Sequence, residues 1–530
     1  DYHDIPLNDR AVYKFLSQRN TGGVFQLESE GMTKVIAGMF TDIDEIPEEE
    51  MNQCFERLVA AVALYRPGPM AYIDDYIKGM KDSSKIHYDH PSLEPILKST
   101  YGIIVYQEQV MQIVQKLAGY TLGRADLVRK SMGKKKQKIM DQEKYVFIYG
   151  NKEAYESGKD ANYAPGCIAN GIPEETATII WNKMADFAKY AFNRSHAVCY
   201  AYISAITAWL SCYYPVEFYS AMLNAFRLQS DKVKTYLAQI YHRDIKILPP
   251  DINRSATVYS VEDNAIRYGL SGIKCVNKFM DNVIKERDDN GEFHGFQDFM
   301  ERMDKIGHPI GKKEIEGLVY SGALDCFDLT KSSMLSFYEV FSKDLAKNKK
   351  RLEGQYSIFD MEQFSELAVI DIPRIPEFKK RELMEKEQEM LGIYLSGHPV
   401  DIYEQMMVNG GKMISISDCI NKEYEGDIAT VGMIKDFRKV WTKKEEEMLL
   451  FRVENRLDNI PCVIFPREAA RLKAYVQEGK IIMLYGKLVE NENYGKQIIV
   501  NNIIPESEAL ERMMSQKFMA RIYVPVMNKE

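Results

Sequence analysis

The feature that most restricts the fold is a change in hydrophobic pattern near residue 423. Beyond it lie five β-branched runs, separated by charged or glycine-containing turns: 427–440, 447–455, 461–466, 480–490 and 496–505. A helix-like segment, REAARLKAYVQEG, follows the third run. Five short strands with a helix after the third are typical of a small closed barrel of the OB type. The pattern predicts such a domain over 423–510.

Upstream of that change the periodicity is helical. The clearest case is the segment 106–119, which Gly119 ends and whose apolar stripe consists of Val110, Ile113, Val114 and Leu117. Short helices and glycine turns continue from about residue 231 to 330, and the charged stretch 343–360 is typical of a linker. The predicted fold is therefore multidomain and mainly α, followed by the small all-β barrel.

Length and composition set the class of protein. The 530 residues allow roughly three or four domains. A hydrophobic content of 45% with 28% charged residues describes a globular protein with an ample core. The eight cysteines form no C-x-x-C pair, which indicates reduced thiols and neither a zinc ribbon nor a disulfide framework.

The sequence also bears on membrane contact. The N-terminus lacks a signal-peptide pattern. The charge-free segment 197–216 has the length of a membrane span, but its Tyr, Ser and Thr content and Pro215 favour a helix buried between protein layers. We therefore expect a cytoplasmic protein without a membrane partner.

A basic run, LVRKSMGKKKQK (127–138), stands out in a chain whose net charge is −8. It contains no acidic residue, and Gly133 allows the chain to turn and bring backbone N–H groups close to an anion. A second basic and polar stretch, FNRSH (192–196), interrupts an apolar pattern. A solvated helix face is the simpler alternative for a lysine run. Two such stretches in one acidic chain favour bound phosphate.

Seven motifs occur in a fixed order: TGGVFQLESEGM (21–32), ALYRPGPM (63–70), YGIIVYQEQVMQI (101–113), LVRKSMGKKK (127–136), FNRSHAVCYAY (192–202), KILPPDIN (246–253) and LGIYLSGHP (391–399). Together they resemble the alpha subunit of bacterial DNA polymerase III, the replicative C-family DNA polymerase. The resemblance covers nearly the whole chain but only part of the family protein. It implies fingers (1–230), a helix-hairpin-helix DNA-binding region (231–345), a clamp-binding linker and helical connection (346–422), an OB domain (423–510) and the start of a C-terminal region (511–530).

The resemblance implies a DNA-directed DNA polymerase, a nucleotidyltransferase that adds deoxynucleotides under the direction of a template. Such enzymes hold Mg²⁺ with palm carboxylates, and two metal ions clamp the attacking and leaving oxygens. We expect the PHP domain, palm and thumb upstream of Asp1, so no catalytic or metal-binding residue is assigned here and the chain alone is expected to be inactive. Asp42 and Asp44 form a D-x-D pair, but DIDEIPEEE is typical of a solvated turn.

The retained part resembles the fingers, which receive the incoming triphosphate. Guanidinium and ammonium groups offset its charge and orient the leaving pyrophosphate. The nucleotide-binding candidates are Arg129, Lys130, Lys134, Arg194, His196 and Tyr200. Tyr200 could stack on a base or sugar, or be a buried tyrosine of the apolar helix. The polar residues of FQLES and YQEQ are expected to make buried hydrogen bonds, and Arg66 to be structural.

Three elements are expected to bind DNA. Lys135 and Lys136 extend the basic run toward the template. The segment 268–287 resembles a helix-hairpin-helix, which holds duplex backbone through N–H groups near Gly272 and Lys274. In that segment Cys275 and Asn277 occupy places where the family pattern has glycine. The segment 312–327 is a candidate second hairpin, although packing against the core explains its apolar residues equally well. The barrel contributes a basic and aromatic surface for single strands, formed by Arg438, Lys439 and Trp441. Phe451 and Phe437 are the other aromatic candidates, and for them the alternative is a place in the barrel core.

Gln355, Ile358 and Phe359 fit the pattern Q-x-x-[LI]-F, which is similar to the peptide by which replication proteins bind the sliding clamp. An apolar pair fills a groove while the glutamine hydrogen-bonds at the rim. The implied partners are primer-template DNA, deoxynucleoside triphosphates, the sliding clamp and other replicase subunits. A non-catalytic DNA- and clamp-binding protein is the alternative, and the motifs do not separate a principal replicase from a repair-type paralogue.

Overall fold

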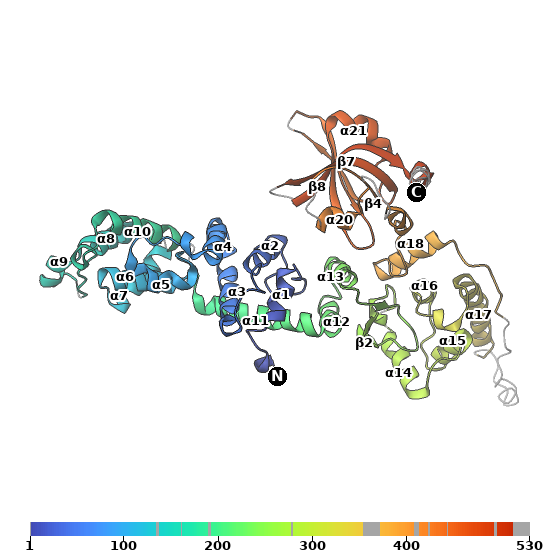
Figure 1. The fold of residues 1–530 in the computed structure, drawn as a ribbon. Coiled ribbons are helices and arrows are strands. Elements are labelled where there is room, and N and C mark those ends of the chain that lie inside the picture. Colours follow the sequence, from blue (N-terminus) through green and yellow to red (C-terminus); the bar gives the residue numbers. More distant parts are fainter. Residues whose placement is uncertain are drawn as a thin grey trace, which may run out of the picture. The chain divides into compact units, whose positions relative to one another are not determined.

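The computed structural model describes residues 2–133, 137–160, 162–188, 192–276, 279–352, 372–407, 413–421, 425–442, 444–491, 495–511 and 513. The chain forms two compact units, Asp1–Phe218 and Tyr219–Glu530. Figure 1 shows that the first is entirely helical and that a barrel of strands lies in the second. The mainly α fold followed by a small β-barrel is confirmed, whereas the five-part domain division stays a prediction.

The first unit contains α1 (Arg10–Ser17), α2 (Glu30–Met39), α3 (Asn52–Leu64), α4 (Ile73–Lys81), α5 (Glu94–Leu97), α6 (Gln107–Ala118), α7 (Leu122–Gly133), α8 (Gln137–Tyr149), α9 (Lys152–Glu156), α10 (Glu174–Ala188) and α11 (Arg194–Tyr213). The predicted stripe of α6 is buried, and Gly119 follows the helix with a φ of 72°. Glycine adopts this left-handed conformation without a steric cost, which explains why the helix ends there.

Two hydrophobic cores organise this unit. One joins α1–α4 to α11, and the other joins α5 and α6 to the helices that follow. The face of α11 that packs on α3 consists of small residues: Ala197, Ala201, Ser204, Ala205 and Ala208. Its other face is partly open, since Ile203 is 43% exposed. The predicted buried helix is therefore buried along one side only, and no helix in the described part of the chain is long and apolar enough to cross a membrane.

The second unit begins within α12 (Pro215–Ala225) and continues as a helical region. A three-stranded sheet, ordered β1-β3-β2, is built from β1 (Ile247–Leu248), β2 (Ser260–Glu262) and β3 (Ala265–Arg267). The helices around it and before the barrel are α13 (Ser230–His242), α14 (Met280–Asn290), α15 (Phe296–Lys305), α16 (Lys312–Tyr320), α17 (Lys331–Leu352), α18 (Lys380–Leu391), α19 (Asp401–Met407) and α20 (Ile416–Asn421).

The first part of the predicted linker is helical. Residues 343–352 belong to α17, which was not expected from their charge. The sequence KDLAKNKKRL contains no glycine or proline before Gly354, and most of its residues have high helix propensity. Charge alone therefore does not end a helix that a folded segment has already nucleated. The rest of that linker, 353–360, lies outside the described residues.

The barrel is closed in the order β4-β5-β6-β8-β7. Its strands are β4 (Gly426–Trp441), β5 (Glu447–Glu454), β6 (Asn459–Ile464), β7 (Ile481–Asn491) and β8 (Gly495–Pro505), and α21 (Pro466–Leu472) follows the third. The pairing of β4 with β7 closes the sheet, and β6 pairs parallel to β8. Buried side chains from every strand and from α21 fill the interior. All five predicted strands and the intervening helix are confirmed.

Candidate functional site

The N-terminus of α6 is fixed by a buried glutamine. The Gln109 Oε1 atom accepts hydrogen bonds from the backbone N–H groups of Val105 and Tyr106, at 2.8 and 3.0 Å. Its Nε2 donates to the Thr100 hydroxyl at 2.8 Å. These bonds satisfy polar groups that burial would otherwise leave unpaired. Gln109 of the YQEQ motif thus makes the buried hydrogen bonds expected from the sequence and holds the first turn of α6 in place, whereas Gln107 and Glu108 are only half-buried.

The two basic stretches meet at this turn. Gln107 accepts a hydrogen bond from Arg129 Nη1 of α7 at 2.7 Å. The neighbouring Glu108 accepts the backbone N–H of Arg194, the first residue of α11, at 3.1 and 3.2 Å. A further backbone bond, from Gln107 N–H to the Phe192 carbonyl at 2.9 Å, ties the start of FNRSH to the same turn. Residues distant in sequence are thereby gathered around two consecutive positions of α6.

Arg129 and Lys130 share one carboxylate. Arg129 donates from Nε and Nη2 to Asp126 Oδ1, at 2.9 and 2.7 Å, and Lys130 Nζ lies 2.6 Å from Asp126 Oδ2. Hydrogen bonds from Lys130 and Arg129 lower the pKa of Asp126. With Gln107 on Nη1, all three nitrogens of Arg129 are engaged within the protein. Lys130 remains 56% exposed.

Arg194 is held differently. Its Nη2 donates to both carboxylate oxygens of Glu56 on α3, at 2.7 and 2.8 Å. The bond to Glu56 is the main cause that raises the pKa of Arg194. The guanidinium also lies 5.8 Å from the centroid of the Tyr106 ring. Its side chain is 45% exposed, so solvent and ligands can reach it.

An aromatic ladder follows Arg194 along α11. The ring centroids of Phe192 and His196 are 5.2 Å apart, those of His196 and Tyr200 4.3 Å, and those of Tyr200 and Phe25 5.4 Å. His196 is exposed and Tyr200 is half-buried. Tyr200 packs partly against the core, and its stacking on a base or sugar stays a prediction. Cation and aromatic faces are therefore adjacent.

Several candidates lie outside the described residues. They are Lys134, Lys135 and Lys136 of the basic run, Asn277 of the hairpin, and Gln355, Ile358 and Phe359 of the clamp motif. The described candidates of the fingers are Arg129, Lys130, Arg194, His196 and Tyr200, and all of them belong to the first unit.

The D-x-D pair is engaged by cations. Arg57 Nη1 and Nη2 donate to Asp42 Oδ1 and Oδ2, at 2.6 and 3.0 Å, and the Arg57 side chain is only 4% exposed. Asp44 accepts from Lys14 at 2.9 Å on the surface. Among the described residues, no three His, Cys, Asp or Glu side chains are grouped so that they could hold a metal ion. Asp42 therefore stabilises α3 through Arg57, which the sequence pattern did not reveal.

The hairpin segment folds as a tight turn. A short 3-10 helix, Leu270–Gly272, precedes α14, and Cys275 has a φ of 73°. This left-handed conformation is the one for which glycine is the usual residue, so the substitution noted in the sequence stores local strain. The N–H of Lys274 donates to the Met390 carbonyl at 3.0 Å, and that of Gly272 to the Gly269 carbonyl at 3.0 Å. These two N–H groups are occupied within the protein, and Lys274 offers an exposed side chain.

The barrel candidates lie together at one end of β4. Trp441 is 65% exposed, and Arg438 and Lys439 are exposed beside it. Lys439 lies 3.9 Å from Glu447 across the β4–β5 pair. Phe451 is 3% exposed and belongs to the core, as the alternative for it proposed, and Phe437 packs partly against the same core. The end of β4 therefore offers an aromatic ring and two cations to a ligand.

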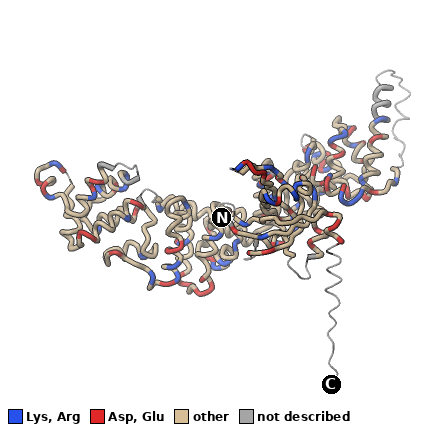
Figure 2. Tube along the Cα trace, turned by 90° about the horizontal axis from the view of Figure 1, so that it is seen from above, with Lys and Arg blue, Asp and Glu red and all other residues tan. Residues whose placement is uncertain are grey.

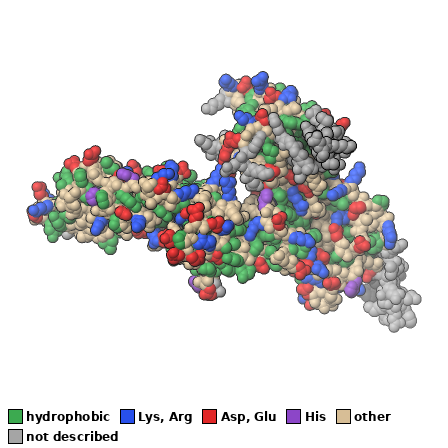
Figure 3. Space-filling view, in the orientation of Figure 1, with side chains coloured by type: hydrophobic (Ala, Val, Ile, Leu, Met, Phe, Trp, Pro, Cys, Tyr) green, Lys and Arg blue, Asp and Glu red, His purple; other side chains and the backbone are tan. Residues whose placement is uncertain are grey.

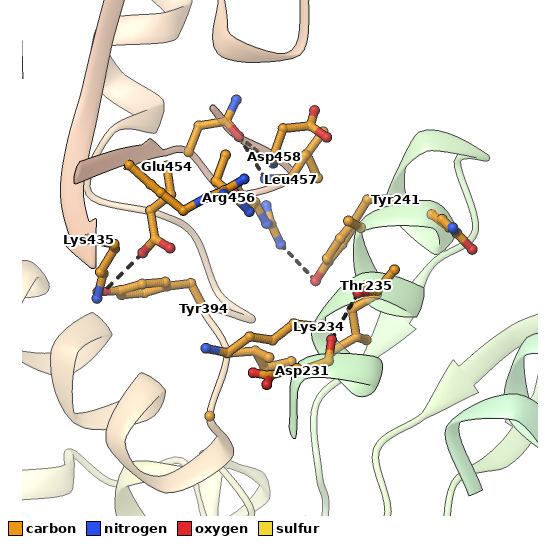
Figure 4. Close-up of a pocket in the computed structure, with 18 of the residues that line it drawn as sticks. Asp231, Lys234, Thr235, Tyr241, Tyr394, Lys435, Glu454, Arg456, Leu457 and Asp458 are labelled. Atoms are coloured by element: carbon orange, nitrogen blue, oxygen red, sulfur yellow. Dashed lines mark hydrogen bonds and ion pairs between the residues drawn. The ribbon is translucent and has the colours of Figure 1, made fainter. Parts of the chain in front are cut away.

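A cavity of about 650 Å³ lies between α13 and the barrel within the second unit. Figure 4 shows Arg456, from the turn after β5, pointing toward Tyr241 of α13. Arg456 Nη2 donates to the Tyr241 hydroxyl at 3.2 Å, and to the Leu395 carbonyl at 2.6 Å. His242 Nε2 lies 3.1 Å from Asp458 Oδ2. The hydrogen bond with Asp458 is the main cause that raises the pKa of His242. None of the candidate site residues lines this cavity, although Gly392, Ile393 and Tyr394 of the LGIYLSGHP motif do. The turn 455–458 contacts α13 through the polar groups of Arg456 and Asp458.

Charges of both signs are interspersed over the molecule. Figure 2 shows Lys and Arg alternating with Asp and Glu along the trace, and on the face in Figure 3 neither sign forms a large separate area. With a net charge of −8, attraction of an anion must come from local groups rather than from a general field. The cations around α6 provide such groups.

Glu56 is the residue that sequence reasoning missed at this site. It lies in a helix whose neighbouring positions are buried, and it is the direct partner of Arg194. An acidic residue on a helix is common and carries no local signal of such a contact. Only the fold brings α3 to the start of α11.

Comparisons with known proteins give three matches along the chain. The bacterial DNA polymerase III alpha subunit finger domain matches residues 1–155, a helix-hairpin-helix motif matches 244–334, and an OB-fold nucleic acid binding domain matches 428–506. The helix-hairpin-helix match includes both candidate hairpins.

Curated relatives match over more of the chain. DNA polymerase III alpha subunits from Aquifex aeolicus, Chlamydia pneumoniae and Borreliella burgdorferi are 33%, 34% and 33% identical over 97%, 90% and 99% of this chain. The chain spans 40%, 37% and 43% of the length of these relatives. A single-stranded DNA-binding protein from Mycobacterium smegmatis is 19% identical in sequence, and the alignment covers 16% of this chain and 92% of that protein's chain. Its TM-score is 0.14, so it supports no inference.

Proposed function

This chain belongs to the family of bacterial DNA polymerase III alpha subunits, and we propose that it forms the fingers-to-OB part of a replicative DNA polymerase. In this role it binds the incoming deoxynucleoside triphosphate, the primer-template and the sliding clamp, while the whole protein carries out template-directed synthesis. The observation that carries the proposal is that the Arg129 side chain and the Arg194 backbone N–H bond to consecutive residues of α6, which brings both basic stretches to one turn beside an aromatic ladder.

The cations of the two basic stretches suit a triphosphate. Arg194 and Lys130 keep exposed charged groups, and a guanidinium fork matches phosphate oxygens. His196 and Tyr200 supply aromatic surface for the base or sugar next to them. Lys134 is assigned to the same nucleotide, and Lys135 and Lys136 to template phosphates, because three consecutive ammonium groups cannot all face one ligand. The test is the nucleotide dependence of incorporation by a full-length polymerase that carries Arg194→Ala.

Magnesium ions of the whole polymerase are assigned to carboxylates outside this chain. Asp42 and Asp44, which the D-x-D pattern suggested, do not fit a metal site because each is paired with a cation. The residues described here contribute by binding and orienting the nucleotide. The 530-residue chain alone is proposed to bind DNA without incorporating nucleotides.

The end of β4 is proposed to bind single-stranded template. Trp441→Ala should weaken binding of a short oligothymidine to the 530-residue chain by about 1–3 kcal/mol, because one base loses its stacking partner. Tyr475→Ala is the matched control, since Tyr475 is 42% exposed on the barrel but lies outside the β4 cluster. Fluorescence anisotropy at several salt concentrations measures both. Equal affinities of Trp441→Ala and the parent would remove Trp441 from the binding surface.

The segment Gln355–Phe359 is proposed to bind the sliding clamp. Replacement of Gln355, Ile358 and Phe359 together by Ala should weaken clamp binding by about 2 kcal/mol or more, since apolar anchors dominate such contacts. DNA affinity should stay unchanged, which serves as the internal control. Calorimetry with the clamp measures the effect, and parent-like clamp affinity of the triple variant would show that docking occurs elsewhere.

Gly272 and Lys274 are proposed to contact the duplex backbone, with the Lys274 side chain rather than its N–H as the contact.

A further inference from the structure

Arg194 and Arg129 differ in which of their nitrogens are occupied. Every guanidinium nitrogen of Arg129 donates to Asp126 or Gln107. Arg194 uses Nη2 alone, and that one nitrogen meets both oxygens of Glu56. Within the described part of the chain, Nε and Nη1 of Arg194 make no hydrogen bond. Glu56 therefore engages Nη2 and leaves the Nη1 amino group and the Nε–H group available as separate donors on different sides of the guanidinium.

The carboxylate that holds Nη2 stands on a rigid support. Residues 57–64 of α3 are all buried, so the helix that carries Glu56 is fixed in the core. The backbone of Arg194 is fixed independently, by the bond of its N–H to Glu108 and by the Asn193 cap of α11. With both ends held, the long arginine side chain keeps one orientation although it is 45% exposed.

We propose that Glu56 is a positioning residue of the nucleotide site: by holding Nη2 it orients Arg194 so that the Nη1 amino group donates to a phosphate of the incoming nucleotide. This inference rests on the proposed function of Arg194. A free arginine on the surface samples many rotamers, and ordering it at the moment of binding opposes the contact. Glu56 supplies that order beforehand, and Asp126 with Gln107 does the same for Arg129.

The experiment is a double-mutant cycle in the full-length polymerase, with single-turnover incorporation of one nucleotide as the readout. Glu56→Gln keeps the shape of the side chain but removes its charge, and should lower kcat/KM for the nucleotide about ten-fold through misplacement of Arg194. Glu48→Gln is the matched control, because Glu48 forms a similar 3.0 Å ion pair in the same unit, with Arg10 of α1 as its partner. It should leave kcat/KM unchanged, and both variants should keep the parent's melting temperature.

The cycle separates positioning from a general structural role. In the Arg194→Ala background, Glu56→Gln should have no further effect, because its target is gone. An equal ten-fold loss in both backgrounds would overturn the proposal, as would an increase in nucleotide affinity, which would make Glu56 a competitor of the phosphate. If Arg194→Ala lowers kcat/KM and Glu56→Gln does not, only the role of Glu56 fails. If Arg194→Ala itself leaves incorporation unchanged, the proposed nucleotide site fails first.

Discussion

Arg194→Ala in the full-length polymerase is expected to lower the single-turnover rate of nucleotide incorporation by about 10²–10³-fold. The Nη1 amino group of Arg194, which Glu56 leaves available, can donate to a phosphate oxygen. Charge develops on the leaving pyrophosphate during the reaction, so this contact strengthens in the transition state. Primer-template affinity should change little, because the arginine is assigned to the nucleotide and not to the DNA backbone.

Two other substitutions sharpen this result. Arg129→Ala and Lys130→Ala should also impair incorporation more than DNA binding, but less than Arg194→Ala, because both cations are already paired with Asp126. Lys144→Ala is the matched control, since Lys144 is a half-buried cation of the same unit that bonds to Asn182. The comparison requires incorporation rates at several nucleotide concentrations and DNA dissociation constants at several salt concentrations. If Arg194→Ala changed only DNA affinity, with a salt slope lower by about one, it would be a DNA-backbone contact.

Asp42→Ala should destabilise the first unit by about 3–5 kcal/mol. The change leaves Arg57, whose side chain is 4% exposed, as a buried charge without its carboxylate. The remaining bonds of Arg57, to the Met39 carbonyl at 3.1 Å and to Gln53 at 3.4 Å, offset little of the lost charge pairing. Hydrogen exchange of the α3 amides is the suitable measurement, because it reports on this unit separately from the barrel.

Asp44→Ala provides the contrast. Its partner Lys14 is 50% exposed and Asp44 is 63% exposed, so the loss should stay within about 0.5 kcal/mol. A second check is Asp42→Ala combined with Arg57→Met, which should recover much of the stability because no buried charge remains. Equal and small effects of Asp42→Ala and Asp44→Ala on α3 would show that Asp42 has no structural role, and would reopen the D-x-D pair as a functional element.

The sequence could predict the local structures because their signals are local. Five runs of β-branched residues determine the barrel, since alternation with period two can bury only one face of each strand. The stripe on α6 and its terminal Gly119 determine that helix in the same way. The order of the motifs carried the resemblance to the family, because long motifs in a fixed order carry more information than any one of them. The linker prediction at 343–352 was wrong because a charged composition is compatible with an exposed helix.

Only the tertiary structure decided which side chains face one another. The sequence proposed Arg129 and Arg194 separately, and the fold brings them to adjacent residues of α6 while it supplies Glu56 from α3. It also decided that Asp42 serves Arg57. The physical reason is that periodicity reports which face of a helix is buried, whereas a hydrogen bond depends on the positions of two elements that are distant in the chain. Packing of the small-residue face of α11 on α3 sets those positions, and no local pattern encodes them.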